Sequence, residues 1–126
     1  MKKVAIIDDD EIFQFTTRVK FQKLDLASEV LIFGDGEEAM DFLKDCIISD
    51  LPDILLLDIN MPIVDGWDFL KLFGDLEVEK KEKIEIHMLS SSINPDDVKR
   101  AENNPFVSDY ITKPIRDEDL TKIFHD

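Results

Sequence analysis

The sequence lacks the features that mark secreted and membrane proteins. Its one cysteine, Cys46, cannot form a disulfide within the chain, which favours a reducing compartment. The apolar run at residues 4–7, which follows two lysines, is far too short for a signal peptide. No apolar stretch approaches the ~20 residues that a membrane-spanning helix needs. We therefore expect a soluble, cytoplasmic protein.

Positive charge is also scarce. The chain has 15 Lys and Arg against 29 Asp and Glu, which gives a formal net charge of -14. A nucleic-acid-binding protein needs a basic face for the phosphate backbone, so this balance argues against that class. It suggests instead partners with basic patches. The basic cluster at residues 80–83 is interrupted by Glu82, and we expect it in a solvated loop or at a helix end.

The composition is that of an ordinary globular protein, with 44% hydrophobic and 35% charged residues. A chain of 126 residues is long enough to bury a full core and too short for two domains. Residues 1–126 are therefore expected to form a single domain.

Short apolar runs alternate with segments of helical periodicity. The runs that predict strands are residues 3–7, 29–33, 54–57, 84–89 and 107–112. The segments that predict helices are residues 11–24, 37–48, 66–76, 95–103 with Asn94 as its N-cap, and 117–124, with 77–83 as a helix end or loop. Parallel neighbouring strands need right-handed helical crossovers, so this alternation predicts an α/β fold, a five-stranded parallel sheet with helices on both faces.

Polar side chains follow four of the five expected strands. These residues are Asp8 and Asp9, Asp58, Ser90 and Ser91, and Lys113. The carboxyl ends of parallel strands lie along one edge of the sheet, where open α/β sheets build their sites. We therefore expect these side chains to converge. Asp58 ends the central strand and is the best candidate for a nucleophile.

The convergence predicts chemistry on phosphoryl groups. Several carboxylates at one edge repel one another unless a cation lies between them. Mg²⁺ suits such a site, because it binds through carboxylates, waters and a phosphate oxygen. The hydroxyl of Ser90 and the ammonium of Lys113 could hold the remaining oxygens of a phosphoryl group. Together these parts suit in-line transfer of a phosphoryl group to the carboxylate of Asp58.

Each of these residues also has an ordinary structural role as its alternative. Asp9 or Asp10 could cap the helix that follows, and Asp58 could belong to a turn. The serines and Lys113 could simply end their strands. His87, inside a strand pattern, is expected to be structural. The prediction of a site depends on all the polar groups reaching the same edge.

Four motifs resemble the receiver domain of two-component response regulators, and the resemblance covers essentially the whole chain. They are the Ile-Ile-Asp-Asp-Asp run at 6–10, Leu-Leu-Leu-Asp-Ile-Asn-Met-Pro at 55–62 with Asp-Gly at 65–66, Met-Leu-Ser-Ser at 88–91, and Tyr-Ile-Thr-Lys-Pro at 110–114. The resemblance implies a (βα)5 flavodoxin-like receiver fold. It also implies a single-domain, chemotaxis-regulator-like protein that switches its partner-binding surface on phosphorylation.

The resemblance implies a role for each site residue. Asp58 would accept a phosphoryl group from a phosphohistidine on a sensor histidine kinase or a phosphotransfer protein. Asp8, Asp9 and Asp58 would hold Mg²⁺, or Mn²⁺, with the backbone carbonyl of Asn60. Lys113 would pair with the phosphoryl group. The protein would assist its own phosphorylation and dephosphorylation without being a conventional turnover enzyme.

Further roles concern the switch itself. Ser90 would be the hydroxyl that moves to meet the phosphoryl group, and Tyr110 would be the aromatic that turns inward with it. Asn60 and Ser92 would flank the path of the attacking water and tune the lifetime of the phosphoryl group. A downstream protein partner would bind the face of the last two strand-helix units.

Three other functions compete with this interpretation. A phosphatase of the haloacid-dehalogenase type also uses a strand-end Asp and Mg²⁺. It needs a second Asp two residues on as general acid, where this chain has Asn60, and the chain lacks an obvious cap insertion. A receiver-like binding module that is never phosphorylated is disfavoured because the whole constellation of site residues is present. A flavin-binding protein of related topology would need a phosphate-cradling loop after the first strand.

Overall fold

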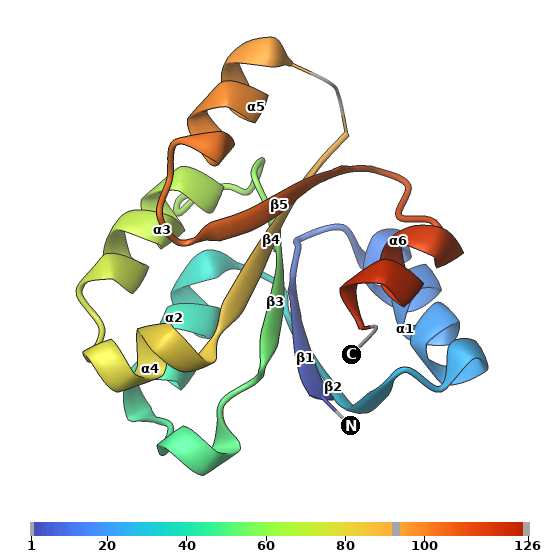
Figure 1. Ribbon diagram of the computed structural model, residues 1–126, viewed down its shortest axis with the longest axis horizontal. Helices are drawn as coiled ribbons and strands as arrows, with labels where there is room; N and C mark the ends of the chain where they lie inside the picture. The colour runs from blue at the N-terminus through green and yellow to red at the C-terminus, as the bar shows by residue number, and fades with distance from the viewer. Residues whose placement is uncertain (1, 92–93, 125–126) are drawn as a thin grey trace.

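Strands and helices alternate along the chain as the sequence predicts (Figure 1). The computed structural model describes residues 2–91 and 94–124. Within them lie β1 (Lys2–Ile7), α1 (Glu11–Leu24), β2 (Ala27–Phe33), α2 (Gly36–Asp45), a 3₁₀ turn η1 (Ile48–Asp50), β3 (Ile54–Asp58), α3 (Gly66–Gly74), α4 (Val78–Lys83), β4 (Glu85–Ser90), α5 (Pro95–Glu102), β5 (Val107–Thr112) and α6 (Asp117–Ile123). Among these described residues, no helix is both long and apolar enough to cross a membrane.

All five strands pair in parallel, in the order β2-β1-β3-β4-β5, which confirms the predicted sheet. Helices α1 and α6 cover one face, and α2, α3 and α5 cover the other (Figure 1). The central strand β3 is buried at every residue. Its side chains alternate between the two layers, Leu55 and Leu57 toward one and Ile54 and Leu56 toward the other. Burial on both faces explains why the strand is a continuous apolar run.

The starts of the helices agree with their capping residues. Asp10, and not Asp9, caps α1, because its side chain accepts hydrogen bonds from the N–H groups of Ile12 and Phe13. Asn94 caps α5, which begins at Pro95 as predicted. Since Asp10 satisfies the first N–H groups of α1, the carboxylate of Asp9 is left available to the edge of the sheet.

Several boundaries differ from the predicted ones by a few residues. The helix predicted over residues 37–48 ends at Asp45, and η1 follows it. The helix predicted to reach residue 76 ends at Gly74, and β2 begins earlier than predicted, at Ala27. Strand β4 extends to Ser90. Apolar periodicity continues beyond these points, so the pattern alone did not show where the helices stop.

Residues 77–83 correct one interpretation of the sequence. They contain a separate helix, α4, and its lysine side chains donate hydrogen bonds to backbone carbonyls of other elements. Lys80 is 5% exposed, and its Nζ donates to the carbonyl oxygens of Leu43 and Lys44, each at 2.8 Å. Lys81 Nζ donates to Gly74 O at 2.9 Å, and Lys83 Nζ donates to Ile48 O at 2.8 Å. The lysines thus bind carbonyls near the ends of α2 and α3 and in η1, where helices leave acceptors unsatisfied.

Replacement of Lys80 by Met should lower the free energy of unfolding by about 1–3 kcal/mol, because two carbonyls near the end of α2 lose their buried donor. Urea unfolding measures this change. Lys44→Met, at an exposed position of α2, serves as the matched control and should change stability by less than about 0.5 kcal/mol. Equal effects of the two substitutions would contradict the role given to Lys80.

Candidate functional site

The predicted side chains do come together at the carboxyl edge of the sheet. Asp8 follows β1, Asp58 is the last residue of β3, and Ser90 is the last residue of β4. Lys113 follows β5 directly, and its N–H donates to Ser90 O at 2.7 Å. The parallel register places the end of β3 between the ends of β1 and β4. Asp58 therefore lies at the middle of this edge.

Three carboxylates form the acidic part of the site. One oxygen from each of Asp8, Asp9 and Asp58 lies within 4.8 Å of the other two. Asp8 and Asp58 are buried, and Asp9 is exposed. A hard divalent cation takes oxygen ligands in such an arrangement, so these residues fit a metal ion. The open side at Asp9 would leave coordination positions for water and for a substrate oxygen.

Lys113 supplies a positive charge to this cluster. Its Nζ donates to Asp8 Oδ2 at 2.5 Å and lies 3.4 Å from Asp58 Oδ1. The ammonium therefore bridges the two buried carboxylates. It is closer to Asp8, so the carboxylate of Asp58 is only partly compensated.

The environment of Asp58 shifts its protonation. Burial, and after it repulsion from the nearby Asp8 carboxylate, raises the pKa of the Asp58 carboxyl, which comes to about 6. Lys113 and the backbone N–H of Asn60, which lies 3.4 Å from Asp58 Oδ1, act in the opposite direction. Burial and repulsion outweigh these contacts. A cation added beside Asp58 would favour the ionised form, which is the nucleophilic one.

The loop after β3 is held tightly against the site. Gly66 N–H donates to Ile59 O at 2.8 Å. A Cβ atom at Gly66 would lie 2.8 Å from both Asp58 O and Ile59 Cα, so only glycine fits at the start of α3. Ile63, between these points, has a φ of 68° and is 93% exposed. Asp-Gly at 65–66 thus fixes the point at which the chain, after the loop that follows Asp58, packs back against the end of β3 and begins α3.

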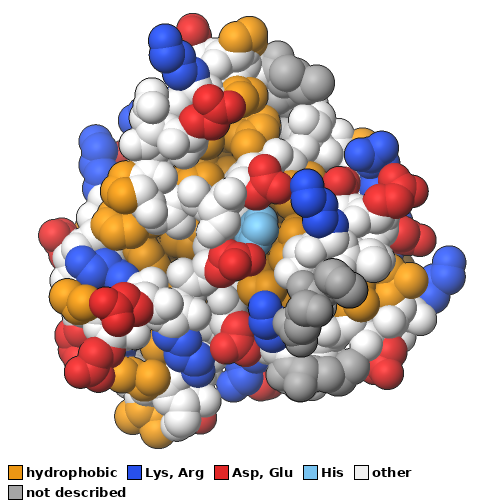
Figure 2. Space-filling view, in the orientation of Figure 1, with side chains coloured by type: hydrophobic (Ala, Val, Ile, Leu, Met, Phe, Trp, Pro, Cys, Tyr) orange, Lys and Arg blue, Asp and Glu red, His pale blue; other side chains and the backbone are white. Residues whose placement is uncertain are grey.

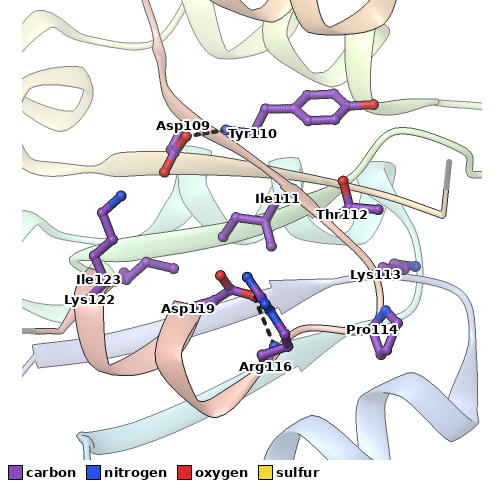
Figure 3. Close-up of a pocket in the computed structure, with 10 residues that line it drawn as sticks. All are labelled: Asp109, Tyr110, Ile111, Thr112, Lys113, Pro114, Arg116, Asp119, Lys122 and Ile123. Carbon is purple, nitrogen blue, oxygen red and sulfur yellow. Dashed lines mark hydrogen bonds and ion pairs between the residues drawn. The ribbon is translucent and has the colours of Figure 1, made fainter. Parts of the chain in front are cut away.

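The residues predicted for the switch lie on the neighbouring strands β4 and β5. Ser90 is buried at the end of β4. Tyr110 is half-buried on β5, and its side chain packs against the core layer that contains α3. Figure 3 shows Tyr110 and Ile111 on opposite sides of β5, with Lys113 beyond the end of the strand. Ser92, predicted to tune the phosphoryl lifetime, falls outside the described residues. Asn60 is exposed immediately after Ile59.

A cleft of about 580 Å³ lies between β5 and α6, and Lys113 lines it, although none of the three carboxylates does (Figure 3). Its lining includes Asp109, Tyr110, Arg116 and Lys122. Figure 2 shows that acidic and basic side chains are interspersed over this face of the molecule. His87 is buried in the neighbouring strand β4, and its Nε2 lies 2.6 Å from Glu85 Oε2, in agreement with a structural role. Tyr110 therefore lines an open cleft and lies on β5, the strand that leads to Lys113 at the carboxyl edge.

Phe13 is the contributor to the site that sequence reasoning missed. Its ring centroid lies 4.4 Å from Lys113 Nζ. The apolar stripe of α1 predicted only a core position for Phe13, and the residue is indeed buried. A contact between residues one hundred positions apart leaves no signal in the local pattern.

Comparisons with known proteins agree with the geometry. A family model described as the response regulator receiver domain matches residues 4–125. The probable methanogenesis regulatory protein FilR2 of Methanothrix harundinacea is 28% identical over 94% of this chain and 76% of its own length. The transcriptional regulatory protein CpxR of Klebsiella pneumoniae is 33% identical over 95% of this chain and 46% of its own length. This chain thus spans about half the length of CpxR.

Solved structures give the same result. The two-component response regulator of Cytophaga hutchinsonii has a TM-score of 0.89 and 30% identity, and the match covers 97% of this chain and 92% of that one. The structural match and the family model therefore indicate the same protein family.

The raised pKa of Asp58 predicts how stability depends on pH. The folded protein holds this proton more tightly than the unfolded chain does, so ionisation of Asp58 costs stability as pH rises from about 4 through about 6. Asp58→Asn removes this cost. Without metal, it should unfold at higher urea concentration than wild type at about pH 7.5, with a gain of up to about 3 kcal/mol, and the gain should vanish near pH 4.

Asp41→Asn, at an exposed position of α2, provides the control for removal of one carboxylate. Its stability should follow that of the wild type across the same pH range. A gain for Asp58→Asn that is the same at both ends of the range would show that the effect does not come from ionisation.

Proposed function

This chain belongs to the response regulator receiver domain family, and we propose that Asp58 is the residue on which it accepts its phosphoryl group. One observation carries the proposal. The carboxylate of Asp58 is buried at the end of the central strand, with two further carboxylates and the Lys113 ammonium around it. Receiver domains of response regulators are phosphorylation-activated signalling switches rather than conventional enzymes, and this arrangement suits that role.

The carboxylates of Asp8, Asp9 and Asp58 would hold Mg²⁺, or Mn²⁺, with the backbone carbonyl of Asn60. Support comes from the spacing of the three carboxylate oxygens and from the charge at Asp58, which Lys113 compensates only in part. When bound, the ion neutralises negative charge on the oxygens of the transferring phosphoryl group. The three carboxylates would thereby act as ligands. Asp58 would bind the ion through one carboxylate oxygen and keep the other free to attack the phosphoryl group.

In the transfer, an ionised oxygen of Asp58 attacks the phosphorus of a phosphohistidine. The bond from phosphorus to oxygen forms, the bond from phosphorus to nitrogen breaks, and the donor imidazole keeps the electron pair. Lys113 pairs with a phosphoryl oxygen, for which its ammonium moves away from Asp8. The hydroxyl of Ser90 donates to another oxygen, because Ser90 lies at the end of the neighbouring strand.

The added group brings close to two negative charges and three acceptor oxygens. Capture of the Ser90 hydroxyl would pull the end of β4, and the neighbouring β5 carries Tyr110. We propose that Tyr110 turns inward with this movement. The surface formed by β4, α5, β5 and α6 would then change shape for a downstream protein partner. The cleft beside Tyr110 supports this placement.

Other assignments follow from the same proposal. The donor would be a sensor histidine kinase or a phosphotransfer protein. Asn60 and Ser92 would tune the lifetime of the phosphoryl group. Residues 1–126 would act as a single domain that signals by binding a partner. Its location in the cytoplasm, expected from the single cysteine, remains a prediction.

The proposal is tested by intact mass after incubation with Mg²⁺ and acetyl phosphate. Wild type should gain one phosphoryl group only when Mg²⁺ is present, and Asp58→Ala should gain none, because the acceptor oxygen is gone. Asp41→Ala, an exposed aspartate of α2, should be phosphorylated like wild type.

Other results would refute the assignment. Steady release of phosphate without an adduct would favour a phosphatase. Neither adduct nor turnover would indicate a binding module that keeps the residues of a receiver.

A further inference from the structure

The aromatic ring of Phe13 lies over the ammonium of Lys113. The ring centroid is 4.4 Å from Nζ, well within the range of a cation–π interaction. The Phe13 residue is 8% exposed and the Lys113 side chain 15% exposed, so little water separates them. Cation–π attraction is stronger where the cation is shielded from water.

A series of four contacts leads from Asp8 through Asp10, Phe13 and Lys113 back to Asp8, and it fixes the position of the ring relative to the acidic cluster. Asp8 Oδ1 accepts a hydrogen bond from Asp10 N–H at 2.9 Å. Asp10 Oδ1, the cap of α1, accepts from Phe13 N–H at 3.3 Å. The Phe13 ring contacts Lys113 Nζ, which donates to Asp8 Oδ2. The start of α1 therefore places the ring relative to the same carboxylate that binds the lysine.

A lysine needs such support more than an arginine would. Its ammonium sits on a flexible four-carbon stem. Here the ammonium lies 2.5 Å from Asp8 Oδ2 and 3.4 Å from Asp58 Oδ1, so Asp8 draws it away from the candidate acceptor. An aromatic face on the α1 side limits where Nζ can move and keeps water from that side.

We propose that Phe13 is a positioning residue, whose ring holds the Lys113 ammonium within reach of both Asp8 and Asp58. It acts through Lys113 and does not itself contact the phosphoryl group. The inference rests on the proposed function, because the value of this position lies in the use of Lys113 to neutralise an oxygen on Asp58. The ordinary alternative is that Phe13 only fills the core.

The chain offers a matched control for that alternative. Phe21 lies on the same helix and in the same core layer, and it is 2% exposed. Its ring packs against Phe124 with centroids 5.1 Å apart. Phe21→Leu therefore removes a buried ring of the same kind in a different contact. Phe13→Tyr keeps an aromatic face at position 13, whereas Phe13→Leu keeps only an apolar side chain there.

The first measurement needs neither metal nor phosphoryl group. A proton held over an aromatic face resonates upfield, so the methylene protons beside Lys113 Nζ should be shifted upfield in the NMR spectrum of the wild type. We expect the shift to persist in Phe13→Tyr and Phe21→Leu and to disappear in Phe13→Leu. An ordinary lysine position in the wild type, or a shift unchanged in Phe13→Leu, would overturn the proposal.

The second measurement is a double-mutant cycle on the rate of phosphorylation by acetyl phosphate with Mg²⁺. Phe13→Leu should slow the reaction roughly 3- to 10-fold in the wild type and leave the rate of Lys113→Met unchanged, because its effect passes through the lysine. Phe13→Tyr and Phe21→Leu should stay within about 2-fold of wild type. Thermal melting confirms that each variant is folded under the assay conditions.

The outcomes separate this inference from the function beneath it. If Phe13→Leu slows Lys113→Met by the same factor, or if Phe21→Leu slows the reaction as much, the ring acts only as core packing and the inference fails alone. If the wild type gains no phosphoryl group, the proposed function fails, and the NMR shift decides whether Phe13 positions the lysine.

Discussion

The candidate site is organised around an imbalance of charge at one edge of the sheet. The carboxylates of Asp8, Asp9 and Asp58 meet there, and the ammonium of Lys113 lies closest to Asp8. Asp58 consequently carries a pKa raised by burial and by repulsion. A carboxylate in that condition responds to any cation or phosphoryl group that enters. The parallel sheet, the cap of α1 and the glycine at the start of α3 all serve to bring these groups together.

This imbalance explains how a small chemical change could reach a distant surface. A phosphoryl group on Asp58, as proposed, would compete with Asp8 for Lys113 and would offer acceptors to Ser90. Lys113 follows β5 and its N–H is bonded to Ser90 O, so both groups belong to neighbouring strand ends. Tyr110 lies on β5, the strand that ends directly before Lys113. A rearrangement at the edge therefore has a short path to the surface of β5 and α6.

The amino-acid sequence was sufficient to predict the fold and the residues that meet at the edge, because both follow from regular patterns. Period and burial identify strands such as β3, and parallel topology brings Asp8, Asp58, Ser90 and Lys113 together. It was not sufficient for contacts across the fold. The role of Lys80 near the end of α2 and the ring of Phe13 over Lys113 join segments distant in the chain. The raised pKa of Asp58 likewise depends on burial.

The ionisation of Asp58 can be followed directly by an NMR titration of the carboxyl carbon of that residue. We expect a midpoint near pH 6 in the metal-free protein, since the pKa is raised to about 6. Saturating Mg²⁺ should lower the midpoint, because a bound cation favours the carboxylate. A midpoint near the ordinary value for an aspartate, unmoved by Mg²⁺, would show that neither burial nor a cation governs the charge of Asp58.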